Sequence, residues 1–349
     1  MNYKLMIPVF LIVLLASCKQ SGPILPAAAG TRFEILVVID DSLWKAPSGR
    51  ALVALLDRNM EALPQAEPVL SINRCRRIDF GDLLKPSRNI LITEVGPRFE
   101  IADVTYARNT WSRPQSVVKI VAANDSALHD LIQREGEKIL NYFLVTERNR
   151  QINIGKNYLN HKAKNEIEKK FGIQVDIPSE LTKISKGKDF YWVTNAHAHN
   201  RLDMVVYSYP YTDRNTFTAE YLIAKRDSFM KANIPGEFEG SYMGTEIKHA
   251  YPILNEINVN NTYCLEMKGL WKIFNGGSMG GPFYSHTRVD EVNKRVITVE
   301  GFVFAPGKKK RNFIRQLEAA VWTTKLPQEI NAIKEVSVVA DKNQQNNKN

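Results

Sequence analysis

Runs of hydrophobic residues along the first half of the chain predict three buried strands and two helices. A short continuous apolar run with β-branched residues is typical of a buried strand, and apolar residues spaced three or four positions apart are typical of a helix with one buried face. The strands are expected at 33–40, 89–95 and 115–121, and the helices at 50–60 and 125–150. Pro64 and Pro68 prevent the first helix from continuing.

The second half has the same kinds of pattern, with longer aromatic-rich strands toward its end. Strands are expected at 174–177, 190–194, 203–208, 264–274, 281–289 and 295–304, and helices at 161–171, 216–232 and 312–323. Asn293-Lys294 fits a tight turn between the last two strands. We therefore predict an α+β fold of mixed or antiparallel sheets with packed helices. Its two similar-sized halves would cover 32–160 and 161–340.

The N-terminus has the pattern of a bacterial lipoprotein signal. Lys4 precedes an apolar run at 5–15, and Leu15-Ala16-Ser17-Cys18 places small residues before a cysteine. We expect residues 1–17 to be a signal peptide and Cys18 to be lipidated. Residues 18–31 would then form a flexible tether. The protein would be anchored to a membrane by acyl chains on Cys18, since two or more chains give stable attachment.

Composition excludes several other classes of protein. The chain has 349 residues, 44% of them hydrophobic and 24% charged, which is typical of a folded globular protein. The net charge of +10 is scattered except at 308–311, a basic run that fits either a loop or a contact with anionic lipid. A nucleic-acid role conflicts with export.

Residues 341–349 are polar and are expected to be a disordered tail. Cys75 and Cys264 could form a disulfide or remain free.

Familiar catalytic and metal-binding motifs are missing from the sequence. His197 and His199 would face the same side of a strand, but no further ligands follow at a suitable spacing, so no metal is predicted. Asp40-Asp41 ends the first strand without a phosphate-binding loop after it. Neither a nucleotide motif nor a G-x-S-x-G turn is present, and no cofactor is predicted. Catalytic residues therefore stay unassigned.

Two glycine-rich segments, 236–244 and 276–285, form the densest unusual pattern in the chain. Glycines beside aromatic residues allow close approach of backbones and could frame a binding cleft. The predicted cleft residues are Ser241, Tyr242, Met279, Tyr284 and Ser285. Alternatively, these glycines and aromatic residues end strands above a core, which is a common arrangement.

A series of short motifs in a fixed order resembles one family of uncharacterised envelope lipoproteins from Bacteroidetes-type bacteria. The motifs are EILVVID near the start, LPQAEP at 63–68, RNILI at 88–92, W-x-x-P-Q at 111–115, Arg226-Asp227, PGEFEGSYM at 235–243, GLW at 269–271, MGGPF at 279–283, EGFVFAP at 300–306 and RQLEA at 315–319. They resemble the domain of unknown function 4837 family along nearly the whole mature chain. The resemblance implies an exported lipoprotein of one recurring architecture and implies no activity.

Three functions are compatible with the sequence. The first is a non-enzymatic binding or assembly module with an envelope protein or glycan partner. The second is a hydrolase acting on envelope glycan, peptide or lipid material, with Ser241, Tyr242, the 276–285 loop and His286 at its cleft. The third is a scaffold whose basic run meets anionic lipid or a protein. No acidic cluster follows Cys18 as in a surface-export signal, so we expect the outer membrane, facing the periplasm.

Overall fold

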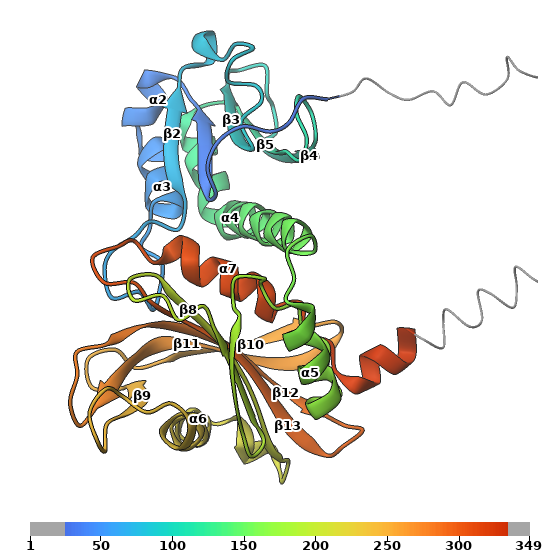
Figure 1. The fold of residues 1–349 in the computed structure, drawn as a ribbon. Coiled ribbons are helices and arrows are strands. Elements are labelled where there is room, and N and C mark those ends of the chain that lie inside the picture. The colour runs from blue at the N-terminus through green and yellow to red at the C-terminus, as the bar shows by residue number, and fades with distance from the viewer. Residues whose placement is uncertain (1–24, 334–349) are drawn as a thin grey trace, which may run out of the picture.

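The computed structural model describes residues 25–333, which form two β-sheets with packed helices (Figure 1). The predicted α+β class is confirmed: one sheet is mixed and the other is antiparallel. Cys18, the signal peptide and the polar tail at 341–349 lie outside the described residues.

The first sheet is a five-stranded mixed sheet with the order β2-β1-β3-β5-β4. Its strands are β1 (Glu34–Val38), β2 (Ser71–Cys75), β3 (Asn89–Val95), β4 (Asp103–Arg108) and β5 (Ser116–Ala122), and only β4 is antiparallel to its neighbour. The associated helices are α2 (Asp41–Lys45), α3 (Pro47–Leu56), the short 3-10 helix η2 (Arg77–Asp79) and α4 (Asp125–Gly155). Helices α3 and α4 bury their apolar sides on one face of this sheet.

The second sheet is antiparallel, with the order β10-β11-β12-β13-β8-β7-β6 and with β9 also paired to β11. Its strands are β6 (Lys183–Gly187), β7 (Phe190–Thr194), β8 (Arg201–Pro210), β9 (Tyr242–Glu246), β10 (Ile253–Val259), β11 (Thr262–Phe274), β12 (Gly280–Asp290) and β13 (Arg295–Phe304). Its helices are α5 (His161–Phe171), η3 (Arg214–Phe217), α6 (Ala219–Asn233) and α7 (Arg311–Val321). One apolar core lies under α5 and α7, and another lies under α6 on the opposite face.

Several strands were not expected from the sequence, and four of them lie at sheet edges. Strands β2 and β4 border the first sheet, and β10 and β6 border the second. An edge strand with polar, half-exposed side chains has no continuous apolar run to reveal it. The prediction of a strand at 174–177 is wrong, because only Gln174 forms a bridge, with Lys325. Its alternating apolar side chains are buried beside α5 without joining a sheet.

The segment predicted to be a flexible tether, 18–31, is fixed over its last residues. The Ala28 amide donates to the Arg113 carbonyl at 3.1 Å, and the Arg113 amide donates to the Pro26 carbonyl at 2.8 Å. The Ala29 amide donates to the Pro86 carbonyl at 2.8 Å. Residues 26–29 are therefore held against the first half, since backbone pairing satisfies their polar groups.

Helices α4 and α7 lie side by side between the two sheets (Figure 1). The loop before β2 reaches across to the start of α7, where the Glu67 carboxylate accepts the Lys310 amide at 2.5 Å and the Arg311 amide at 3.1 Å. The Arg311 guanidinium also donates to the Pro68 carbonyl at 2.7 Å. A carboxylate at a helix N-terminus satisfies free N–H groups and favours the helix dipole. The first half thus caps a helix of the second.

These contacts remove half of the basic run at 308–311 from the surface. Lys310 and Arg311 are 5% and 8% exposed. The Lys310 ammonium donates to Gln65 at 2.9 Å, within the same junction. The run is therefore a structural contact between the halves at these two positions, and it does not form a continuous basic patch for lipid.

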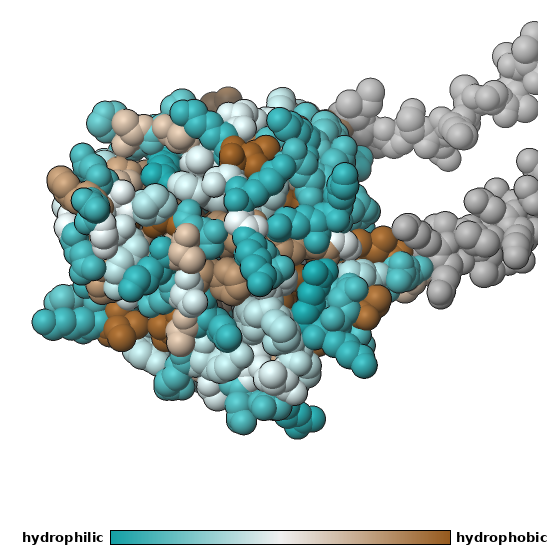
Figure 2. Space-filling view, turned by 60° about the horizontal axis from the view of Figure 1, so that its bottom comes forward, coloured by the Kyte–Doolittle hydropathy of each residue, from teal (hydrophilic) through white to brown (hydrophobic). Residues whose placement is uncertain are grey.

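Within residues 25–333, every helix is too short or too polar to cross a bilayer. Figure 2 shows a face that is mostly hydrophilic, with brown apolar groups separated from one another. Scattered apolar side chains of this kind are normal on a protein surface.

Candidate functional site

The structure brings the two glycine-rich segments together around one cavity, but the five predicted cleft residues do not all line it. The Ser241 hydroxyl donates to the Phe238 carbonyl and accepts the Phe238 amide, so it closes the turn before β9. Tyr242 stacks on Phe274 with 5.6 Å between the ring centres. Met279 lines this cavity of about 300 Å³, to which the other four predicted residues do not contribute. Ser241 and Tyr242 therefore have local roles beside β9, whereas Met279 lines the cavity together with Gly236 and Met243.

Tyr284 and Ser285 lie in the second sheet, and both are almost completely buried. As neighbours on β12 they point to opposite faces. Tyr284 belongs to the core under α7, and the Ser285 hydroxyl approaches the Met267 carbonyl at 3.4 Å. Neither hydroxyl is accessible to a substrate.

Around Tyr284 the structure forms a closed polar network. The Tyr284 hydroxyl donates to Glu266 at 2.6 Å and accepts the Trp322 indole N–H at 2.8 Å. His286 Nε2 lies 2.8 Å from the same oxygen. Because the tyrosine proton goes to Glu266, the ring nitrogen must donate, which makes His286 the neutral Nε2–H tautomer. Its Nδ1 atom is buried without a partner.

Burial lowers the pKa of His286 to about 3, although the nearby Glu266 carboxylate acts in the opposite direction. Burial also raises the pKa of Tyr284 well above its ordinary value, helped by the Glu318 and Glu266 carboxylates. A histidine that stays neutral and sealed, 2% exposed, cannot serve as an accessible general base. The network stabilises the core under α7. His286 therefore cannot act as the catalytic histidine that the hydrolase hypothesis requires.

We expect this histidine to make the protein sensitive to acid. The unfolded chain takes up a proton near pH 6.5 and the folded one only near pH 3, so stability is complete above 6.5 and falls as the pH drops toward 3. His286→Gln should flatten the fall in the free energy of unfolding by up to about 1.4 kcal/mol per pH unit in this window. Urea unfolding between pH 7 and pH 4.5 measures this slope. The exposed His197, changed to Gln, is the matched control, and equal slopes in both variants would refute the assignment.

The other residues that the sequence analysis considered for chemistry do not line the cavities described in this section. His197 and His199 are exposed in the loop between β7 and β8. Asp41 pairs with Arg74 at 2.6 Å at the end of the first strand. Among the described residues, no group of three or more histidine, cysteine or acidic side chains could hold a metal ion. Cys75 and Cys264 are both free, one in each sheet.

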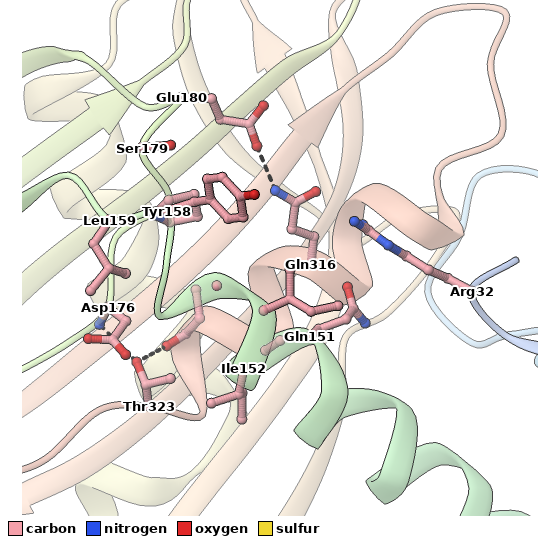
Figure 3. Close-up of a pocket in the computed structure, with 15 residues that line it drawn as sticks. Arg32, Gln151, Ile152, Tyr158, Leu159, Asp176, Ser179, Glu180, Gln316 and Thr323 are labelled. Carbon is pink, nitrogen blue, oxygen red and sulfur yellow. Dashed lines mark hydrogen bonds between the residues drawn. The ribbon is translucent and has the colours of Figure 1, made fainter. Parts of the chain in front are cut away.

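A cavity of about 330 Å³ lies where the two halves meet, and we call it the seam cavity (Figure 3). Its walls come from the end of α4 and the following linker, from the 176–180 segment, and from one face of α7, with Arg32 contributed by the segment before β1. Gln316, Ala319 and Ala320 follow helical spacing and so share that face, and Thr323 lies in the turn after α7. This volume is at the small end of the range for ligand pockets.

A buried polar side chain without a hydrogen-bond partner lines this cavity. Gln151 is only 8% exposed, yet neither its side-chain oxygen nor its nitrogen has a hydrogen-bond partner. By contrast, Asp176 is paired with Lys164 at 2.6 Å, and Gln316 donates to Glu180 at 2.5 Å. An unpaired buried amide costs about 1–3 kcal/mol of stability until a hydrogen-bond partner satisfies it.

Two large apolar side chains stand at the rim of the seam cavity. Ile154 is 49% exposed and Tyr158 is 64% exposed, and both line it. Exposed apolar groups beside a cavity are typical of a binding site. The sequence analysis did not identify this site, because its residues come from distant segments and include no catalytic motif.

Two family models match the chain, one in each half. Residues 160–323 match the family model described as Domain of unknown function (DUF4837). This match confirms the predicted family resemblance over the second half of the chain, and not along nearly its whole length. The first-half motifs lie instead within a second match, to the family model described as Domain of unknown function (DUF8532), at residues 28–156. No curated protein matches the chain.

The DUF4837 region therefore begins at the linker that follows α4, and the seam cavity is lined by both matched regions. Gln151 and Ile154 come from the DUF8532 region, whereas Glu180 and Gln316 come from the DUF4837 region. Both descriptions leave the activity unknown.

Proposed function

We propose that this protein is a lipid-anchored envelope lipoprotein that binds a small ligand in the seam cavity and carries out no chemical reaction on it. The observation that carries the proposal is the buried, unpartnered Gln151 amide in the wall of a cavity of ligand size. The buried states of Ser285 and His286 support a binding role over hydrolysis at the glycine-rich segments. The anchor rests on the sequence around Cys18.

A binding site at the junction of two halves suits a signalling or assembly module. A ligand held by α4 and α7 contacts both halves at once, so it favours the arrangement in which the cavity is formed. Attachment through Cys18 would keep this module at the outer membrane, on its periplasmic side, where an envelope protein or glycan partner is available.

The anchor is tested by changing Cys18 to Ala. We expect the native protein to stay with the membrane fraction in high salt and to enter the detergent phase, because acyl chains bind through hydrophobic burial. Cys18→Ala should lose the lipid mass and leave the membrane fraction. Ser17→Ala, which keeps the cysteine, is the matched control. Detergent partitioning of an unlipidated Cys18→Ala variant would contradict the proposal.

Filling the seam cavity tests the binding role. Ala319 is 3% exposed on the cavity face of α7, so Ala319→Phe should place its ring in the cavity. A small-molecule extract of the native envelope should raise the unfolding midpoint of the native protein and not that of Ala319→Phe, since only a ligand bound to the folded state stabilises it. Ala232→Phe, at an exposed alanine of α6, is the matched control. Equal midpoint shifts in all three proteins would refute binding at this site.

A further inference from the structure

Two exposed side chains of opposite charge, Arg32 and Glu180, line the seam cavity, and neither forms an ion pair within the described residues. The Arg32 guanidinium has neither a hydrogen-bond nor an ion-pair partner within residues 25–333. The Glu180 carboxylate accepts a neutral amide, from Gln316, and pairs with no cation in the same part of the chain. Figure 3 shows Arg32 and Glu180 on opposite sides of Gln316. A ligand with one negative and one positive end would match both.

The Gln151 amide adds a third requirement. It has one acceptor oxygen and one donor nitrogen, and both lack partners. A single secondary amide, with its own N–H and C=O, can satisfy both atoms. A lone carboxylate cannot do so, because the oxygen of Gln151 needs a donor and a carboxylate only accepts hydrogen bonds.

The size and the apolar walls of the seam cavity limit the ligand further. A volume of about 330 Å³ admits a molecule of only a few residues. Each residue of an extended chain adds about 3.3–3.6 Å, so two or three residues span a short cavity. Ile152, Leu159 and Ala319 give the walls an apolar part that suits small aliphatic side chains.

We propose that the seam cavity binds a free di- or tripeptide with small side chains. Its carboxylate would pair with Arg32, its ammonium with Glu180, and a peptide group with the Gln151 amide. This inference rests on the proposed binding function and specifies the ligand class. A guanidinium is suited to a carboxylate because it donates two parallel hydrogen bonds.

The test is calorimetric titration of the full-length, detergent-solubilised protein with Ala-Ala, its N-acetyl form, its C-terminal amide and N-acetylglucosamine. Free Ala-Ala should bind best, and blocking either end should weaken binding about tenfold, the loss expected for one charged hydrogen bond. Arg32→Gln should weaken Ala-Ala to the affinity of its amide, and Glu180→Gln should weaken it to the affinity of the N-acetyl form. Arg134→Gln removes an equal charge about 25 Å from Gln151 along α4, and it should leave the affinity for Ala-Ala unchanged.

Gln151→Leu gives a readout that does not depend on the charges. It removes an unpaired amide, so the variant should unfold at the same or a higher temperature while binding Ala-Ala about tenfold more weakly. Equal affinity for free and blocked peptides, or binding of N-acetylglucosamine alone, would overturn the peptide assignment. If the peptides fail and the envelope extract still stabilises the native protein but not Ala319→Phe, the binding function stands and only the ligand class is wrong. If the extract does not stabilise the native protein either, both the binding function and the peptide assignment are refuted.

Discussion

Arg226→Met is expected to lower the free energy of unfolding by about 3–5 kcal/mol, the largest effect of any single change considered for this protein. Arg226 and Glu300 are both completely buried between α6 and β13, with Nη2 and Oε1 2.7 Å apart. The guanidinium also donates to the Thr245 hydroxyl at 2.9 Å and lies 4.0 Å from the centre of the Phe283 ring. Removing it leaves a carboxylate in the core without its cation.

Burial already raises the pKa of Glu300, and Arg226 opposes that rise. In Arg226→Met we therefore expect the pKa of Glu300 to rise further. Adding Glu300→Leu should recover part of the loss, because an apolar pair does not leave a buried charge. Arg58→Met is the matched control: its partner is Glu137 at 2.5 Å, but both side chains are largely exposed, so the cost should stay below about 1 kcal/mol. Urea unfolding measures all four proteins, and similar losses in Arg226→Met and Arg58→Met would contradict this account.

Glu67→Ala is expected to cost about 2–3 kcal/mol, because it leaves two backbone N–H groups at the start of α7 without an acceptor. Glu67 is 3% exposed, so water cannot easily replace the carboxylate. The change also removes a bond between the two halves. Hydrogen exchange should therefore become faster at the Lys310 and Arg311 amides.

The exposed Glu61, in the same loop region, provides the control for Glu67. Glu61→Ala should change the free energy of unfolding by less than about 0.5 kcal/mol. Glu67→Gln keeps an acceptor but removes the charge. Its decrease in the free energy of unfolding should therefore lie between those of Glu67→Ala and Glu61→Ala. A loss within 0.5 kcal/mol for Glu67→Ala would mean that the capping contact contributes little to the junction.

The sequence predicted the central strands well and the edge strands poorly. Strands β3 and β7 and helix α5 have the predicted bounds, because buried strands and amphipathic helices have clear hydrophobic patterns. Strands β2 and β10 were not predicted, because each is an edge strand with few buried side chains. Helix α4 extends past the predicted end to Gly155, and that extra turn supplies the wall of the seam cavity.

The candidate site could not be predicted for a different reason. Gln151, Arg32 and Gln316 are ordinary residues in their own segments, and only the meeting of α4 with α7 gives them a common cavity. Glycine-rich stretches such as 236–244 are prominent in a sequence whether they bind a ligand or end a strand. In this protein Ser241 closes a turn, whereas Gly236 and Met279 line the cavity of about 300 Å³.

The central claim, that the seam cavity holds the ligand, is tested most directly by photocrosslinking in cells. Benzoylphenylalanine replaces Tyr158 at the cavity rim or, as control, Tyr251, which is similarly exposed at 53% but lies in the loop before β10. We predict a small-molecule adduct, found by mass spectrometry, at position 158 that is absent at 251 and is lost when Ala319→Phe is added. An adduct at 158 that survives Ala319→Phe, or equal labelling at both positions including none at either, would contradict the account.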